Sequence, residues 1–171
     1  MRIFINPGHG GGDSGACGHG LIERDVAFNI GKLVRHYLRA VGYDVMLFQF
    51  DGLNTICQQA NAYDADIFVS IHCNSGDGIG AETYESGYSE ASFKLAQAIQ
   101  KQLVDSLPLV DRGVKSANFA VLRGTDMPAV LVETAFIDNF DDAQLLRDRQ
   151  DDFARAIARG ITDFFMGRLT D

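Results

Sequence analysis

Hydrophobic residues recur along this chain with two different periods. Short apolar runs, which are typical of strands, occur at residues 2–6, 44–48, 67–71, 81–85 and 129–132. Apolar residues three and four positions apart predict helices at residues 26–41, 56–63, 93–107 and 153–165. Proline marks some of the boundaries, since Pro7 ends the first strand and Pro108 closes the third helix.

This order of elements predicts the fold class. Strands that alternate with helices form α/β folds, in which right-handed crossovers connect parallel strands. We therefore expect three layers, with a central, mostly parallel β-sheet flanked by helices on both faces. The 171 residues contain neither an internal repeat nor a linker, and this length is typical of one domain, so we expect residues 1–171 to form a single domain.

The chain is acidic, with a formal net charge of −8 at pH 7. Its field repels polyanions, so we expect no nucleic-acid partner. No stretch reaches the roughly 18 apolar residues that a membrane span requires. The apolar start of the chain breaks at Pro7, too early for the core of a signal peptide. We therefore expect a soluble chain with neither a membrane segment nor a signal peptide of its own.

Four polar residues stand where strands end or the first helix begins. His9 follows the first strand, Glu23 opens the first helix, His72 ends the strand IFVSIH, and Glu133 ends the strand AVLVE. Ligands of open parallel sheets bind beyond the carboxyl ends of the strands, so we expect the four side chains to converge. Two histidines and a carboxylate are the ligand set of many catalytic zinc sites. Glu133 is then free to transfer a proton during amide hydrolysis.

Each of these residues also has a purely structural interpretation. His72 alone fits an ordinary histidine at a strand end, and Glu23 alone fits a carboxylate at a helix N-terminus. Glu133 fits a structural role least well, because a carboxylate directly after an apolar strand is partly buried and needs a partner. His19 lies in the same glycine-rich loop and could compete with His9 as a ligand, but it is the weaker candidate.

Cysteine chemistry is the alternative mechanism. Cys17, Cys57 and Cys73 are odd in number and form no CxxC pair, so no disulfide framework is expected. Cys17 or Cys73 with a histidine would suit a cysteine hydrolase. However, adjacent strand residues point to opposite faces, so Cys73 is poorly placed to act with His72. A small buried hydrophobe is the better interpretation of Cys73.

A dinucleotide site is a second alternative. Gly10, Gly12 and Gly15 match the pattern GxGxxG after a strand. In a dinucleotide fold the helix begins inside this motif, whereas here it begins near Glu23. The motif therefore does not predict a nucleotide cofactor.

Several segments together resemble a known family, the zinc N-acetylmuramoyl-L-alanine amidases of the amidase-3 type. The similarity extends nearly from end to end and in order, through NPGHGGGDSGA, GLIERDVAFNI, ANAYDADIFVSIHCNS, GAETY, DRGV, FAVLRGTDMPAVLVETAFIDN and IARGI. The resemblance implies one Zn²⁺ per chain, held by His9, Glu23 and His72, and a catalytic role for Glu133. These are the same positions that the sheet argument selects.

The resemblance also implies a substrate and a place of action. The expected reaction is hydrolysis of the amide between N-acetylmuramic acid and L-alanine in bacterial peptidoglycan, at the cell wall, in an extracellular or periplasmic setting. A cut catalytic domain or a phage-type lysin fits a chain without a signal peptide. An acidic chain gains little attraction to an anionic wall, so we expect a separate wall-binding module or activator as a partner. The alternative activity is a cysteine-type or zinc endopeptidase that acts on the stem peptide.

The chain departs from the family pattern at two places. Ala135 stands where the family usually has glycine, and LFQFDG replaces an arginine-containing segment after the second strand. The first change affects the turn beside the site, and the second is expected to affect surface contacts rather than the metal site. Asn74, Glu82 and Arg123 lie in matching segments and are candidates for the substrate groove, but their roles stay open and no substrate-binding residue is assigned.

Overall fold

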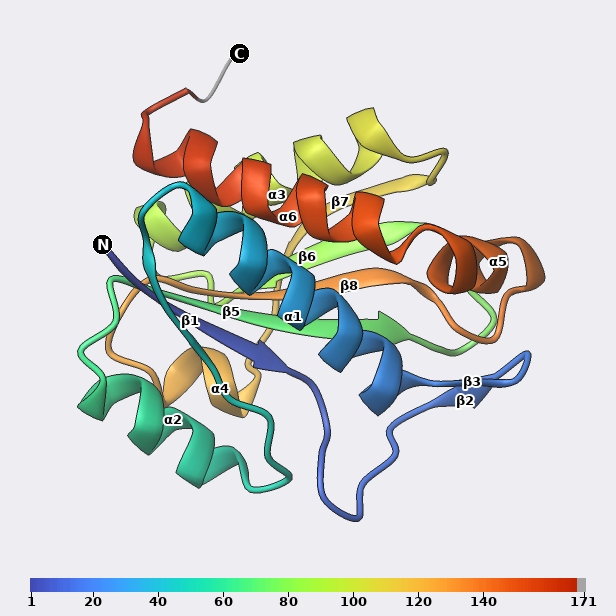
Figure 1. Cartoon of the computed structure of the whole chain (residues 1–171), viewed down its shortest axis with the longest axis horizontal. Helices are drawn as coiled ribbons and strands as arrows, with labels where there is room; N and C mark the ends of the chain where they lie inside the picture. Colours follow the sequence, from blue (N-terminus) through green and yellow to red (C-terminus); the bar gives the residue numbers. More distant parts are fainter. Residues whose placement is uncertain (169–171) are drawn as a thin grey trace.

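The computed structural model describes residues 1–168 and has an α/β architecture (Figure 1). The strands are β1 (Arg2–Pro7), β2 (Cys17–Gly18), β3 (Leu21–Ile22), β4 (Asp44–Leu47), β5 (Ile67–Asn74), β6 (Ala81–Glu85), β7 (Asp111–Ser116) and β8 (Ala129–Phe136). The helices are α1 (Glu23–Ala40), α2 (Leu53–Ala62), α3 (Glu90–Ser106), α4 (Ala120–Arg123), α5 (Phe140–Asp148) and α6 (Gln150–Phe165).

Every element expected from the hydrophobic pattern is present, and the structure adds five more. The additional elements β2, β3 and α4 have two, two and four residues, too few to show a period. The polar strand β7 lies at the edge of the sheet and is mostly half-buried. The helix α5 has nine residues, of which only Asp142, Ala143 and Leu146 are buried, so it shows no clear helical period.

Six strands form one sheet in the order β4-β1-β5-β8-β6-β7. All neighbouring strands are parallel except β6 and β8, which are antiparallel. The reversal has a simple cause, because residues 75–80 between β5 and β6 are too few for a crossover helix. The expected central, mostly parallel sheet is therefore confirmed.

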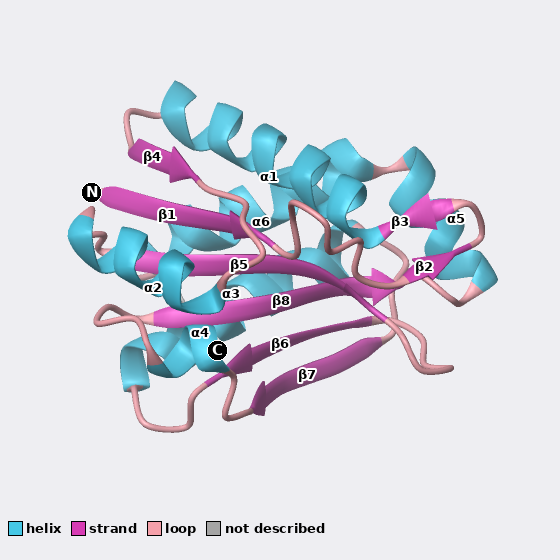
Figure 2. Cartoon of the chain, turned by 90° about the horizontal axis from the view of Figure 1, so that it is seen from below, coloured by secondary structure: helices cyan, strands magenta, loops and turns pink. Residues whose placement is uncertain are grey.

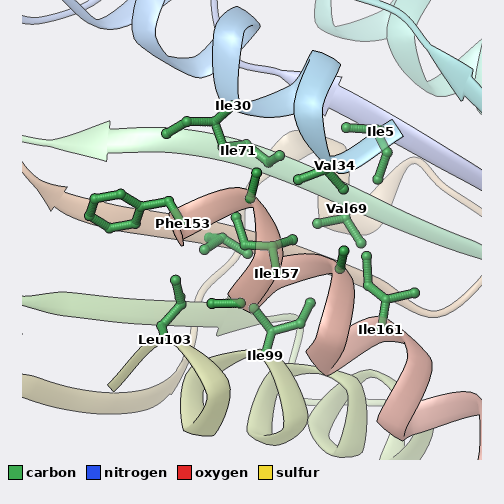
Figure 3. Close-up of a cluster of buried hydrophobic side chains, with 14 of the residues drawn as sticks. Ile5, Ile30, Val34, Val69, Ile71, Ile99, Leu103, Phe153, Ile157 and Ile161 are labelled. Carbon is green, nitrogen blue, oxygen red and sulfur yellow. The ribbon is translucent and has the colours of Figure 1, made fainter. Parts of the chain in front are cut away.

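The two faces of the sheet are covered unequally. Helices α1, α3 and α6 lie on one face and α2 and α4 on the other, which gives the three expected layers (Figure 1). The larger core lies under the first group, where Ile30 and Val34 of α1 meet Ile157 of α6 over the sheet (Figure 3). The smaller core, around Phe4 and Phe68, lies under α2 and α4.

The smaller cover leaves part of the sheet free. Figure 2 shows α2 and α4 in front of the starts of β1, β5 and β8, whereas the ends of these strands and much of β6 and β7 stay uncovered on this side. The apolar residues of this face give way to polar ones toward the strand ends, from Phe4 to Asn6 and from Leu131 to Glu133. Among residues 1–168, no helix has the length and apolar character needed to cross a membrane.

Close packing of α3 against α6 depends on Gly160. A Cβ atom at this position would lie 2.5 Å from Ile99 Cα and 2.8 Å from Ala98 O, so any side chain would push the two helices apart. We expect Gly160→Val to lower the free energy of unfolding by about 2 kcal/mol, because overpacking forces the backbone to shift. Urea unfolding followed by circular dichroism measures this change.

Gly12→Val is the matched control, since a Cβ there meets nothing within 4 Å. Equal stability of the two variants would contradict the close approach of α3 and α6.

Candidate metal centre

Strands β5 and β8 place His72 and Glu133 side by side. The two residues are direct partners in the parallel register, so their side chains project from the same face. Both strands continue beyond them, to Asn74 and Phe136, so His72 and Glu133 lie within strands and not at their ends as the sequence suggested. The register shifts after this pair, and the irregularity marks the rim of the site.

His9 and Glu23 reach the same place from other elements. His9 lies in the loop after β1, and Glu23 is the first residue of α1. His9 Nε2 lies 3.0 Å from Glu23 Oε2, and His72 Nδ1 lies 2.9 Å from Glu23 Oε1. The two imidazole rings meet nearly edge to face, with centroids 5.1 Å apart. The structure thus brings the three predicted ligands together.

The Glu23 carboxylate is buried and fully hydrogen-bonded. Besides the two histidines, the backbone N–H of Ala16 donates to Oε2 at 2.8 Å, and that of Cys73 donates to Oε1 at 3.1 Å. Burial favours the neutral acid, but the hydrogen bonds from His72 and His9 outweigh it and lower the pKa of Glu23 to about 2. Glu23 is therefore an anion at neutral pH.

Two glycines make room for the cluster. A Cβ at Gly8 would lie 2.3 Å from the His72 ring, and one at Gly15 would lie 2.5 Å from both Glu23 Oε2 and the His9 ring. His9 itself has a φ of 60°, a conformation that a non-glycine residue adopts only when its surroundings hold it there. The glycine-rich loop thus serves close packing around imidazole and carboxylate groups.

Asp13 holds the other side of the His9 ring. Its Oδ2 lies 2.8 Å from His9 Nδ1, and its Oδ1 accepts a hydrogen bond from Gly15 N at 2.9 Å. The hydrogen bond with Glu23 and, to a smaller degree, that with Asp13 raise the pKa of His9 to about 9, against the effect of burial. With Nδ1 turned to Asp13, Nε2 is the nitrogen left to face the centre of the cluster.

Glu133 differs from Glu23 in having no such support. Among the described residues, its buried Oε2 atom has no hydrogen-bond partner. Burial is the main cause that raises the pKa of Glu133 to about 7, and the charge of Glu23 adds to it. The partner that the sequence led us to expect is therefore absent from residues 1–168.

A cavity of about 460 Å³ lies over these residues. Glu133, His9, Glu23 and His72 all contribute to its wall. The other side is formed by α2, α4 and the segments before them, which expose the apolar side chains of Phe50, Leu53 and Phe119. A cavity with apolar walls and a few convergent polar groups is typical of a binding site for an organic substrate.

The three clustered side chains fit a metal ion. One ligand atom from each of His9, Glu23 and His72 lies within 4.8 Å of the others. Two imidazole nitrogens and one carboxylate oxygen suit zinc better than calcium or magnesium, which prefer oxygen ligands. Glu133 lines the same cavity and has a carboxylate oxygen without a hydrogen-bond partner among the described residues.

The competing candidates lie elsewhere. Cys73 is buried on the opposite face, and burial raises the pKa of its thiol. His19 lies on the β2–β3 hairpin, where its Nε2 is 3.0 Å from Asp138 O and its ring packs against Phe140. The three cysteines form no disulfide. Helix α1 begins at Glu23 and not within the glycine motif, so the dinucleotide interpretation fails on its own criterion.

Two further residues support the site and were not identified from the sequence. Asp13 is one of them, and its spacing of four residues from His9 was the available signal. Gln49 is the other, because its side-chain amide donates to Gly8 O at 3.0 Å and to Arg24 O at 2.9 Å. The segment LFQFDG therefore supports the loop that carries His9, and its role is not limited to surface contacts.

The other residues noted in the family-like segments differ in whether they lie at the cavity. Asn74 lines the cavity, whereas Arg123 is exposed and does not. Glu82 is buried beside Glu133, its register partner in the antiparallel pair of β6 and β8. Ala135 is buried in the irregular part of β8 and has no positive φ, so alanine fits where glycine is usual.

Comparison with known proteins agrees with this geometry. A family model described as N-acetylmuramoyl-L-alanine amidase matches residues 3–163. The chain belongs to the N-acetylmuramoyl-L-alanine amidase family. Its sequence is 42% identical to the N-acetylmuramoyl-L-alanine amidase LytC of Bacillus subtilis over 95% of this chain and 35% of LytC. It is 40% identical to the endolysin of Bacillus phage SPP1 over 92% of this chain and 62% of the endolysin.

Solved structures of the amidase family share the fold. The amidase AmiC2 of Nostoc punctiforme superposes with a TM-score of 0.91 at 36% identity, over 97% of each chain. This chain therefore matches whole amidase structures, but it spans about a third of LytC and less than two thirds of the endolysin.

The Asp13 contact predicts an effect on metal affinity. A carboxylate behind a ligating histidine orients the ring and raises its basicity, and its loss typically weakens metal binding about ten- to a hundredfold. We expect Asp13→Ala to lower the affinity for zinc by this factor, measured by competition with a chromophoric chelator. Asp51→Ala is the control, because Asp51 lines the same cavity and makes no hydrogen bond to His9. Equal zinc affinity of both variants would exclude this role for Asp13.

Proposed function

We propose that this chain hydrolyses the amide between N-acetylmuramic acid and L-alanine in peptidoglycan, with one Zn²⁺ held by His9, Glu23 and His72. The main support is that Glu133, whose buried Oε2 atom has no hydrogen-bond partner among residues 1–168, lines the same cavity as the three clustered side chains. Membership of the amidase family narrows the reaction from amide hydrolysis in general to this bond.

In this proposal the ion supplies a Lewis acid, which polarises the scissile carbonyl and lowers the pKa of water. Glu133 provides the proton transfers. Its carboxylate accepts a proton from the attacking water while the water oxygen bonds to the carbonyl carbon. The same proton then passes to the amide nitrogen as the C–N bond breaks, which gives a lactyl carboxylic acid and a free amine. The acid then loses its remaining proton to the amine or to solvent. A pKa of about 7 suits a group that must both accept and release a proton near neutral pH.

The apolar part of the cavity would hold the substrate. Phe50, Leu53 and Phe119 offer surfaces for the sugar ring and the methyl group of alanine, and their burial by substrate would exclude water. A cysteine mechanism has less support, because the thiol of Cys73 is buried away from His72 and has a raised pKa.

The place of action follows from the substrate. We infer action at the bacterial cell wall, in an extracellular or periplasmic setting, with residues 1–171 as a single catalytic domain. The relatives include LytC and a phage endolysin. The chain covers 35% of LytC and 62% of the endolysin. A separate wall-binding module or activator is consistent with this difference and with the net charge of −8.

Because Glu133 is proposed to transfer protons and not to bind the metal, its substitution should lower turnover without loss of zinc. Glu133→Gln keeps the shape of the side chain but removes the base, so we expect it to retain one zinc per chain while turnover falls about a hundredfold or more. Elemental analysis measures the zinc content, and the rate of peptidoglycan solubilisation measures turnover. Cys73→Ser is the control and should stay active. A dead Cys73→Ser together with an active Glu133→Gln would reverse the assignment and favour the cysteine mechanism.

The bond that is cut tests the function itself. Hydrolysis of the lactyl amide frees the amino group of L-alanine and leaves the glycan intact. We therefore expect digested peptidoglycan to yield stem peptides with a new N-terminal alanine, identified by amine labelling and mass spectrometry. An endopeptidase would expose an amino group within the stem or its cross-bridge, and a glycosidase would create reducing sugar ends. Stems that stay attached to muramic acid would refute the proposal.

A further inference from the structure

Next to the cavity, much of one face of β6 and β7 stays uncovered (Figure 2). Side chains of these two strands form a compact polar group there. We call the residues Glu82, Tyr84, Arg112 and Lys115 the polar shelf. Glu82 is the register partner of Glu133, and Lys115 is the register partner of Tyr84. The shelf therefore continues, on the same face, the row of side chains that begins with His72 and Glu133.

The polar shelf adjoins the cavity through two direct contacts. Asn74 lines the cavity, and its side-chain amide donates to Glu82 Oε1 at 2.7 Å. Phe119 lines the cavity as well, and its ring meets that of Tyr84 nearly edge to face at 5.1 Å between centroids. A substrate that extends out of the cavity past these residues reaches the shelf without crossing another element.

The charges on the shelf do not cancel. Glu82 is buried and accepts hydrogen bonds from Tyr84 Oη at 2.8 Å and Arg112 Nε at 2.7 Å, and it also forms an ion pair with Lys115 Nζ. Burial favours its neutral form, but Lys115 and Arg112 outweigh burial and lower the pKa of Glu82 to about 2. Among the four shelf residues, one carboxylate thus faces two cations, in a chain whose net charge is −8.

The two cations are also accessible. The side chains of Arg112 and Lys115 are 32% and 37% exposed, whereas that of Glu82 is 3% exposed. Among residues 1–168, Arg112 uses Nε for Glu82 and rests over the ring of Phe136 at 4.9 Å, and its terminal nitrogens make no hydrogen bond. Glu82 and Phe136 hold the guanidinium in place, so the free edge is a preformed donor pair for a planar anion.

We propose that Arg112 and Lys115 form a subsite that binds a carboxylate of the peptidoglycan stem peptide. This inference rests on the proposed function, because it takes the stem peptide as part of the substrate. The glycan offers mainly neutral hydroxyl groups around the cleaved linkage, whereas the stem carries free carboxylates, which match the charge and planar shape of the guanidinium edge. Glu82 orients the two cations.

The test compares two ligands with four proteins. The ligands are a muramoyl tripeptide with its free carboxylates and the same tripeptide with every carboxylate converted to a carboxamide. The proteins are the parent chain, Arg112→Gln, Lys115→Gln and the control Lys101→Gln, whose cation lies on α3 across the sheet and pairs with Asp105. The KM is measured by cleavage, and the Kd is measured by calorimetry with Glu133→Gln added to each protein.

We expect the parent and Lys101→Gln to bind the carboxylate ligand about tenfold more tightly than the carboxamide ligand. Arg112→Gln and Lys115→Gln should each lose most of this preference through weaker binding of the carboxylate ligand alone. A general effect of either substitution on folding or on Glu133 would change both ligands equally, so the ratio isolates the subsite. The parent preference should also fall as salt is added, because the cations are partly exposed.

Equal affinity of the parent for both ligands overturns the subsite. A preference that survives both substitutions overturns it as well. The proposed function fails separately, if neither ligand is cleaved although the preference in Kd is present.

Discussion

The carboxylate of Glu23 is the group on which the rest of the site depends. An almost fully buried anion is costly unless it is paired, and Glu23 is paired on both oxygens. Its two amide donors belong to Ala16 and Cys73, so one side chain joins the loop after β1 to strand β5. Because Glu23 is also the first residue of α1, the position of that helix along the sheet decides how closely His9 and His72 approach each other. The conformation of the loop after β1 and the spacing of His9, Glu23 and His72 therefore depend on the same carboxylate.

The unequal covering of the sheet explains why this cluster opens onto a cavity. Three helices cover one face, and the long apolar stretches of β5 and β8 contribute to that core. On the opposite face α2 and α4 are short, so the apolar cover ends near Phe68 and Leu131. Further along the same strands, each side chain on that face must be polar or must contact a ligand. His72 and Glu133 occupy those positions, which is why polar side chains follow the apolar part of both strands on this face.

Much of this arrangement could be predicted from the sequence, for reasons that also explain what could not. The convergence of His9, Glu23, His72 and Glu133 follows from one rule about parallel sheets, which needs only the order of strands and helices. The support from Asp13 depends on a loop in which His9 adopts a φ of 60°, and no periodic pattern encodes such a conformation. The neighbours of Glu133 on β6 and β7 could not be predicted from the sequence either. They depend on the reversal of β6 and on β7, a polar edge strand without an apolar signal.

Three buried or half-buried carboxylates follow one another across this face, and their surroundings give them different protonation behaviour. Glu23 is balanced by two histidines and Glu82 by Arg112 and Lys115, and in both cases the pKa is about 2. Glu133 lies near both of them, forms no ion pair among residues 1–168, and has a pKa raised to about 7. The two permanent anions contribute to this increase, since their charge opposes a third negative charge nearby. The groups that hold the site together therefore also prepare Glu133 to carry a proton, and a residue that merely stabilised the fold would not require this environment.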